Sequence, residues 1–200
     1  MKQLLFFIFL IFTMTISSFN NLTELPIGSP MPNPDVKMTD ISGKEISLKE
    51  AIKKNGLLVM FSCNTCPYVI KNQGRTLAIN KYALANDVGV ILLNPNEGNR
   101  NGEDSFEAMK DYASAQGYSF YYAVDKKALQ ANAFGAKRTP ECFLFSKDNK
   151  LVYHGAIDDN PGNASAVTRQ HLKEAIDEML AGKEIMVKNT RSVGCSIKRN

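Results

Sequence analysis

Two cysteines separated by two residues, Cys63 and Cys66, are the residues of this sequence best suited to chemistry. They follow an apolar run at residues 57–61 and precede a segment compatible with a helix. This order predicts two thiols at a strand-to-helix corner, where helix N–H groups and the positive end of the helix dipole stabilise a thiolate. Because thiols at this spacing can close and reopen a short disulfide, the expected chemistry is dithiol–disulfide exchange.

The same pair would also suit half of a structural zinc site, which is the alternative interpretation. A second Cys pair at similar spacing is missing from the sequence, and His154 and His171 lie in no cluster with ligand spacing. We therefore expect neither a metal site at Cys63 and Cys66 nor a bound cofactor.

The N-terminus begins with Met1 and Lys2, followed by an apolar run at residues 4–16 and a polar stretch from Asn20. This pattern predicts a secretory signal peptide over residues 1–19, with an uncleaved membrane anchor as the alternative. The run is shorter than the roughly 20 residues that span a bilayer, which favours cleavage. A periplasmic or otherwise extracytoplasmic location is therefore expected.

Charge and cysteine content narrow the choice of partners. The formal net charge of +4 is small and evenly spread, so no nucleic acid partner is expected. The four cysteines of an exported chain are interpreted as disulfide or redox residues before metal ligands. Cys142 and Cys195 lie far from the close pair in sequence and do not suggest a small disulfide-stapled protein.

Alternation of strand-length and helix-length patterns predicts one α/β domain over residues 36–182. A proline-rich extended arm at residues 20–35 precedes it, and a polar tail at residues 183–200 follows. The arm should lie over the domain. Crossovers of this length imply parallel central strands in a mixed sheet with helices on both faces.

The individual elements follow from apolar runs and turn residues. Residues 36–38 and 45–48 flank Gly43 and predict a small β-hairpin ahead of the sheet. The candidate sheet strands are residues 57–61, 88–93, 120–124, 141–145 and 151–154. The candidate helices are residues 49–54, the segment after Cys66, residues 104–115 with Asp104 as the N-terminal cap, residues 127–134 and residues 172–180.

Three segments of the sequence resemble a known family. Residues 61–68, residues 138–143 and residues 194–198 look like segments of exported redoxin-domain proteins, TlpA-like and AhpC/TSA-like, of the thioredoxin-like superfamily. The resemblance covers about residues 25–198. It implies a thioredoxin-like fold with a central mixed sheet and an N-terminal β-hairpin extension.

The resemblance also implies roles for individual residues. Cys63 would be the attacking thiol, more exposed and with the lower pKa, and Cys66, one turn into the helix, would be the resolving thiol. Pro140 would follow a cis peptide bond, and the backbone of Thr139 would pair with an extended substrate beside the disulfide. The alternative for Pro140 is an ordinary trans proline that opens an edge strand.

The sequence departs from the family at the buried acid that often accepts the proton of the resolving thiol. Leu57 occupies that position here, so Glu97 and Glu141 are the candidate substitutes, with solvated carboxylates as the alternative for both. Cys142 lies in an apolar strand and is expected to be a small buried hydrophobic residue. Cys195 is a candidate for an extra redox thiol, resolving or intermolecular, and a partly packed free cysteine is its alternative.

These residues together predict an exported thiol-disulfide oxidoreductase whose direction of electron flow stays open. It would act on a protein or small thiol or disulfide substrate and exchange electrons with a membrane or soluble donor or acceptor. A thiol peroxidase is one alternative. Peroxiredoxins place Thr or Ser shortly before the reactive cysteine and Pro before that, but the matching positions hold Cys63 and Val59, or Met60 and Gly56.

A copper-binding protein of the same fold is the other alternative. Those relatives have one more residue between the two cysteines and a His just before the fourth strand, where this sequence has Thr139 and Pro140.

Overall fold

The computed structural model describes residues 22–200, so the predicted signal peptide lies outside the described residues. Its centre is a five-stranded sheet with the order β5-β4-β3-β7-β8. Strands β3, β4 and β5 run parallel, whereas β7 pairs antiparallel with both β3 and β8. The strands are β3 Gly56–Phe61, β4 Gly89–Asn94, β5 Tyr121–Val124, β7 Glu141–Ser146 and β8 Leu151–Gly155. The predicted mixed sheet and its five strands are confirmed.

The central strand β3 shows why its sequence is continuously apolar. Leu57, Val59 and Phe61 pack into the cluster on one face of the sheet, and Leu58 and Met60 into the cluster on the other. Side chains alternate between the two faces of a strand, so a strand covered on both faces has no solvated position. All five side chains are fully buried.

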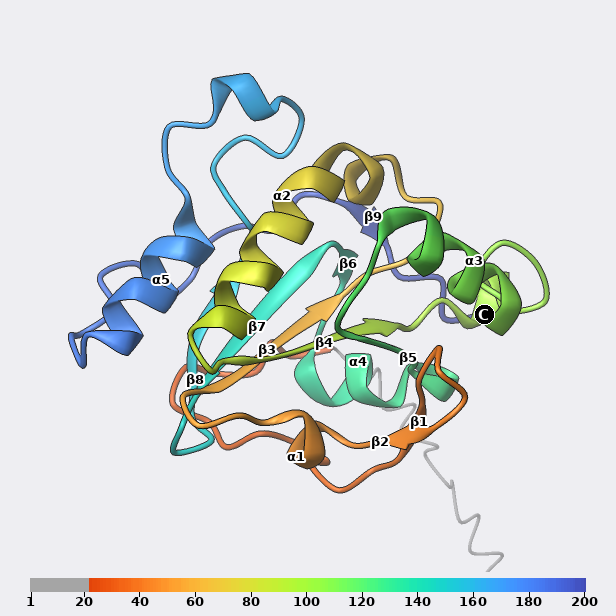
Figure 1. The fold of residues 1–200 in the computed structure, drawn as a ribbon, viewed down its shortest axis with the longest axis horizontal. Helices are drawn as coiled ribbons and strands as arrows, with labels where there is room; N and C mark the ends of the chain where they lie inside the picture. Colours follow the sequence, from red (N-terminus) through yellow and green to blue (C-terminus); the bar gives the residue numbers. More distant parts are fainter. Residues whose placement is uncertain (1–21) are drawn as a thin grey trace, which may run out of the picture.

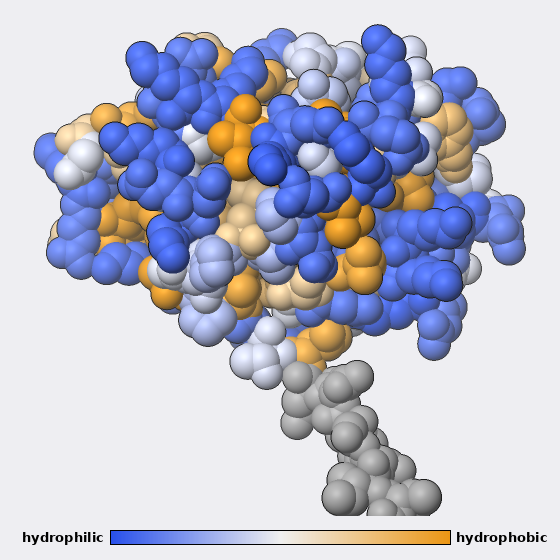
Figure 2. Space-filling view, turned by 90° about the horizontal axis from the view of Figure 1, so that it is seen from below, coloured by the Kyte–Doolittle hydropathy of each residue, from blue (hydrophilic) through white to orange (hydrophobic). Residues whose placement is uncertain are grey.

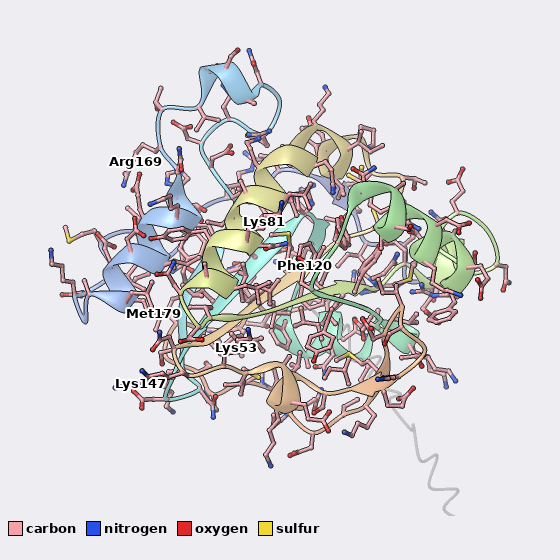
Figure 3. The ribbon with its side chains drawn as sticks, in the orientation of Figure 1. Lys53, Lys81, Phe120, Lys147, Arg169 and Met179 are labelled. Atoms are coloured by element: carbon pink, nitrogen blue, oxygen red, sulfur yellow. The ribbon has the colours of Figure 1, made fainter. Side chains whose placement is uncertain are left out.

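Helices cover both faces of the sheet (Figure 1). One face packs against α2 Pro67–Ala85, α3 Phe106–Gln116 and α5 His171–Leu180, and the other against α1 Leu48–Ala51 and α4 Leu129–Phe134. Phe120, labelled in Figure 3, belongs to the first of these layers, whereas Lys147 and Arg169 lie at the periphery. The short 3-10 helices are η1 Glu97–Asn99, η2 Lys126–Ala128 and η3 Ala164–Ala166.

The predicted hairpin is present as two short strands, β1 Met38–Thr39 and β2 Glu45–Ile46. Gly43 closes the turn with a φ of 79°, a left-handed conformation that suits glycine, and donates its N–H to Asp40. The carboxylate of Asp40 accepts the backbone N–H of Tyr122 at 2.8 Å. This contact fixes the hairpin to the outer strand of the sheet.

The start of α3 differs from the prediction. Ser105, not Asp104, caps the helix, and its side chain accepts the backbone N–H of Ala108 at 3.3 Å. Both residue types are good N-caps, so tertiary contacts decide between them. Asp104 is fully buried and points to other partners, described below.

The arm and the tail both lie against the domain. In the arm, Leu25 donates its N–H to Phe134, and Gly28 donates its N–H to Leu151 at 2.8 Å. In the tail, β9 Cys195–Ser196 pairs with β6 Arg138–Thr139, and Figure 1 shows these two strands side by side.

The face on the side of α1 and the hairpin is mostly hydrophilic (Figure 2). Seen from below, on the side of α1 and the hairpin, hydrophilic residues predominate and hydrophobic residues show as small patches (Figure 2). Within residues 22–200, no helix has the length and apolar character needed to cross a membrane.

Candidate active site

Cys63 and Cys66 lie in the corner between β3 and α2. Helix α2 begins at Pro67, and Cys66 is its N-cap, so the prediction that Cys66 lies one turn into the helix is wrong. Proline is favoured at the first helical position, where an N–H would have no partner in the helix. Cys63 is 1% exposed and Cys66 3%, so the expected greater exposure of Cys63 is also wrong.

Thr139 contacts both thiols. Strand β7 runs antiparallel to β3 with Glu141 opposite Phe61, so the residues before β7 and those after β3 meet at one end of the sheet. The Thr139 hydroxyl lies 3.3 Å from the Cys63 sulfur, and the Thr139 carbonyl oxygen lies 3.1 Å from the Cys66 sulfur. The peptide bond between Thr139 and Pro140 is cis, as the resemblance implies.

A third thiol, Cys195, completes the cluster. Cys195 stands opposite Thr139 in the β6–β9 pair, which brings its sulfur to 2.7 Å from the Cys66 sulfur. The backbone N–H of Cys195 also donates to the Cys66 sulfur at 3.4 Å. Cys195 is partly exposed, in contrast to the buried pair. The tail thus lies along the Thr139 edge, where the resemblance implies an extended substrate.

Hydrogen-bond donors around the Cys66 sulfur lower the pKa of its thiol. The thiol of Cys63 hydrogen-bonds to Cys66 and lowers its pKa to about 4, with further stabilisation from the Cys195 thiol and the backbone N–H groups of Val69 and Cys195. The pKa of Cys63 is raised because it shares its proton with Cys66, because it is buried, and because the Asp104 carboxylate is near. The contacts therefore favour ionisation of Cys66 over Cys63, the opposite of what the resemblance implies.

The residue that follows Cys63 is held by a buried polar network that the sequence analysis missed. The N–H of Asn64 donates to the Asp104 carboxylate at 2.9 Å, and the Tyr122 hydroxyl donates to the Asn64 side chain at 2.9 Å. Asn94 and Asn96 donate their side-chain amides to Asp104 at 2.8 Å and 3.0 Å. The loop between the two cysteines is thereby fixed to β4 and β5. The sequence signal for this network is the Asn-rich segment that follows β4.

The candidate proton acceptors are held by other partners. Glu141 is 3% exposed and accepts the N–H groups of Lys137 and Arg138, both at 2.8 Å. Its second oxygen lies 2.7 Å from His154 Nε2. Glu141 is therefore a buried carboxylate that shapes the turn before Pro140, and not a solvated one.

The second candidate, Glu97, is partly exposed and pairs with Arg100 at 3.0 Å. Proton acceptance by Glu97 or Glu141 stays a prediction.

The fourth cysteine has a different setting. Cys142 is fully buried in the core opposite Met60, as expected for a small hydrophobic residue, and burial raises the pKa of its thiol. Within residues 22–200, no cluster of three or more His, Cys, Asp or Glu side chains could hold a metal ion.

The chain is similar to known proteins along most of its length. The Redoxin family model matches residues 26–172. An uncharacterized conserved protein from Geobacillus kaustophilus is 32% identical, with a TM-score of 0.80 and coverage of 86% of this chain and 92% of that chain. A hypothetical protein from Sinorhizobium meliloti 1021 is also 32% identical, with a TM-score of 0.80 and coverage of 88% and 96%.

A more distant structure shows the fold alone. A mutant of PrxQ from Xylella fastidiosa is 14% identical, with a TM-score of 0.58 and coverage of 80% of this chain and 98% of that chain. No curated protein matches the sequence. The predicted thioredoxin-like fold is confirmed, and the family match together with the clustered thiols supports a thiol redox function.

Proposed function

Because this chain belongs to the Redoxin family, we propose that it exchanges dithiols and disulfides through Cys63 and Cys66. The observation that carries the proposal is the pair of neighbouring thiols at the β3–α2 corner, both in contact with Thr139. Hydrogen bonds from Cys63, Cys195 and the Val69 N–H lower the pKa of Cys66, which favours its thiolate at neutral pH. The thiolate is the attacking species in thiol–disulfide exchange.

The proposed reaction uses both sulfurs in turn. The Cys66 thiolate attacks a substrate disulfide, forms a mixed disulfide and releases one substrate thiol. Cys63 then loses its proton and attacks the Cys66 sulfur, which releases the second substrate thiol and closes the Cys63–Cys66 disulfide. Two electrons pass to the substrate, and a dithiol substrate reverses every step.

This assignment exchanges the two roles that the resemblance implies. It gives the first attack to Cys66, because the neighbouring donors stabilise the thiolate there, and the second to Cys63. The Thr139 hydroxyl, 3.3 Å from Cys63, is placed to hydrogen-bond the Cys63 sulfur as it ionises.

Location and partners belong to the same proposal. The apolar run at residues 4–16 supports export of the chain to an extracytoplasmic compartment. The substrate there would be a protein or small thiol or disulfide, with a membrane or soluble partner that supplies or removes electrons. The net charge of +4 is modest and gives no reason to propose a nucleic acid partner.

The test is dithiothreitol-linked reduction of insulin by the purified protein. We expect Cys63→Ser and Cys66→Ser to abolish catalysis. Cys142→Ala is the matched control, because it removes a buried thiol from the core and leaves the pair intact. Full activity in Cys63→Ser would refute the proposal, and peroxide consumption far above the rate of a free thiol would replace it with a peroxidase.

A further inference from the structure

We propose that Cys195 is a third redox thiol and that the Cys63–Cys66 disulfide rearranges to a Cys66–Cys195 disulfide. This inference rests on the proposed function for the oxidation that forms the first disulfide. Its own basis is the position of the C-terminal tail, which brings a thiol to the sulfur that the two disulfides share. The Cys195 sulfur lies 2.7 Å from the Cys66 sulfur.

The tail occupies the Thr139 edge as an extended strand. Cys195 pairs with Thr139 and Ser196 pairs with Arg138 in antiparallel register. The approach is close at Gly194, where a Cβ atom would lie 2.1 Å from the Thr139 carbonyl oxygen, and Arg138 donates to the Gly194 carbonyl at 3.0 Å. Addition of a strand to a free edge is a general mode of peptide recognition. Here the added strand belongs to the same chain.

The tail is fixed downstream of Cys195. Ile197 is 6% exposed, packs in the core cluster on the α4 face, and donates its N–H to the Lys137 carbonyl at 3.1 Å. Lys198 donates its N–H to the Asn96 side chain at 2.9 Å, and Arg199 donates to the Ala136 carbonyl at 2.6 Å. The predicted polar tail is therefore docked on the domain at its end.

The tail is also fixed upstream. Thr190 donates its N–H to the His154 carbonyl at 3.0 Å, and its hydroxyl accepts the N–H of Ala156 at 2.9 Å. With anchors on both sides, Cys195 meets Cys66 without a search through open conformations. Such positioning makes the reaction of the two sulfurs effectively unimolecular.

The chemical step needs no external oxidant. Cys195 loses its proton and attacks the Cys66 sulfur of the Cys63–Cys66 disulfide. The Cys66–Cys195 bond forms as the Cys63–Cys66 bond breaks, and Cys63 leaves as a thiolate that takes up a proton. One disulfide and one thiol are present before and after, so the step is an isomerisation.

The pKa of Cys195 is higher in the reduced protein than after the Cys63–Cys66 pair is oxidised. Burial raises the pKa of Cys195 to about 11, with a further contribution from its hydrogen bond to the Cys66 thiolate. Closure of the Cys63–Cys66 disulfide removes that thiolate, so Cys195 ionises more readily once the pair is oxidised.

The rearrangement also moves the disulfide outward. Cys63 is 1% exposed and Cys66 3%, whereas Cys195 is partly exposed. A dithiol partner can therefore reach the Cys195 sulfur of a Cys66–Cys195 disulfide more easily than either sulfur of the buried pair. Cys195 is then the sulfur through which the buried pair exchanges electrons with partners at the surface.

A tryptic map of the full-length oxidised protein tests this directly. Trypsin places Cys63 and Cys66 in the peptide of residues 55–71, Cys195 in residues 192–198 and Cys142 in residues 139–147. The protein is oxidised with a small cyclic disulfide, quenched in acid, alkylated and digested. We expect a disulfide between peptides 55–71 and 192–198 in the parent chain and in Cys63→Ser, and none in Cys195→Ser.

Two further measurements sharpen the map. Gly194→Ala should lower the yield of this linked peptide at least tenfold while the disulfide within peptide 55–71 still forms. Peptide 139–147 serves as the internal control for scrambling. Absence of the linked peptide from the parent chain would overturn the inference, even if it formed in Cys63→Ser, and so would equal linkage of Cys142 or linkage only between two chains.

Insulin reduction on the same samples separates the two proposals. Activity that depends on Cys66 without any linked peptide overturns the inference and leaves the proposed function intact. A linked peptide in a chain whose insulin reduction survives Cys66→Ser refutes the proposed function, and the structural contact between Cys66 and Cys195 still stands.

Discussion

Replacement of Gly194 by alanine perturbs the thiolate through the backbone of the tail alone. The new Cβ would lie 2.1 Å from the Thr139 oxygen and 2.7 Å from the Thr139 carbonyl carbon. Both are backbone atoms next to Pro140 and cannot rotate away. Ordinary contact begins at 3.4 Å, so the tail must retreat by about 1.3 Å.

That retreat removes donors from the Cys66 sulfur. The Cys195 N–H already lies at 3.4 Å from this sulfur, so a further 1.3 Å breaks the hydrogen bond, and the thiol contact of 2.7 Å lengthens as well. A hydrogen bond to a charged group contributes about 1.5–3 kcal/mol, and each pKa unit corresponds to about 1.4 kcal/mol. The pKa of Cys66 should therefore rise from about 4 to about 5–6.

The assay is the pH dependence of iodoacetamide alkylation of peptide 55–71 in the reduced protein, together with thiolate absorbance at 240 nm. Gly74→Ala is the matched control, because Gly74 lies in α2 and a Cβ added there would meet no atom within 4 Å. An unchanged pKa in Gly194→Ala, with a melting temperature equal to that of the control, would refute a role of the tail in stabilising the thiolate.

Cys195→Ala removes the thiol donor but keeps the backbone N–H, so the pKa of Cys66 should rise less than in Gly194→Ala and the pair should become less oxidising in a glutathione redox titration. Asp104→Ala leaves the Asn64 N–H and two buried amides without their acceptor, so urea unfolding should show a loss of about 3 kcal/mol or more. Asp125 is buried between β5 and η2, and this burial raises the pKa of its carboxyl to about 6. Its stabilising contribution is therefore complete below pH 4 and is lost as the pH rises through 6. Urea unfolding from pH 4 to pH 7 should show this decline, about 2–3 kcal/mol, in the parent chain and not in Asp125→Asn.

The fold was largely predictable because burial on both faces leaves a simple pattern. In β3 and β4, every residue is buried, so a parallel strand appears in the sequence as an unbroken apolar run. The site was predictable in part for a different reason. Cys63, Cys66 and Thr139 belong to motifs that resemble a known family, and the resemblance implies that these motifs lie next to each other in the fold.

The errors concern features that local sequence does not determine. The start of α2 is an exception, since Pro67 at the first helical position was sufficient to identify Cys66 as the N-cap. The choice between Asp104 and Ser105 as the cap of α3 depended on buried amides from β4 and the following loop. No pattern within the helix could have indicated it.

The least predictable feature was which of the two thiols, Cys63 or Cys66, has the lower pKa. The helix dipole acts on both thiols from the same end, so it does not decide which sulfur is ionised. That choice depends on hydrogen bonds to the Cys66 sulfur, first from Cys63 and then from Cys195, which lies 129 residues away in sequence. Strand β9 has only two residues, too few for any periodic signal.

The position of the tail has a consequence for every substrate. A protein substrate that needs the backbone edge of Thr139 must displace β9. Its apparent affinity is therefore the intrinsic affinity multiplied by the fraction of molecules in which the tail is undocked. A Cys66–Cys195 disulfide would hold the tail in place and close that edge, whereas a Cys63–Cys66 disulfide leaves the tail free to exchange with substrate. The two disulfides therefore differ in whether a substrate can bind the Thr139 edge, as well as in which cysteines they join. The docking of the tail determines which partners can reach the thiol pair.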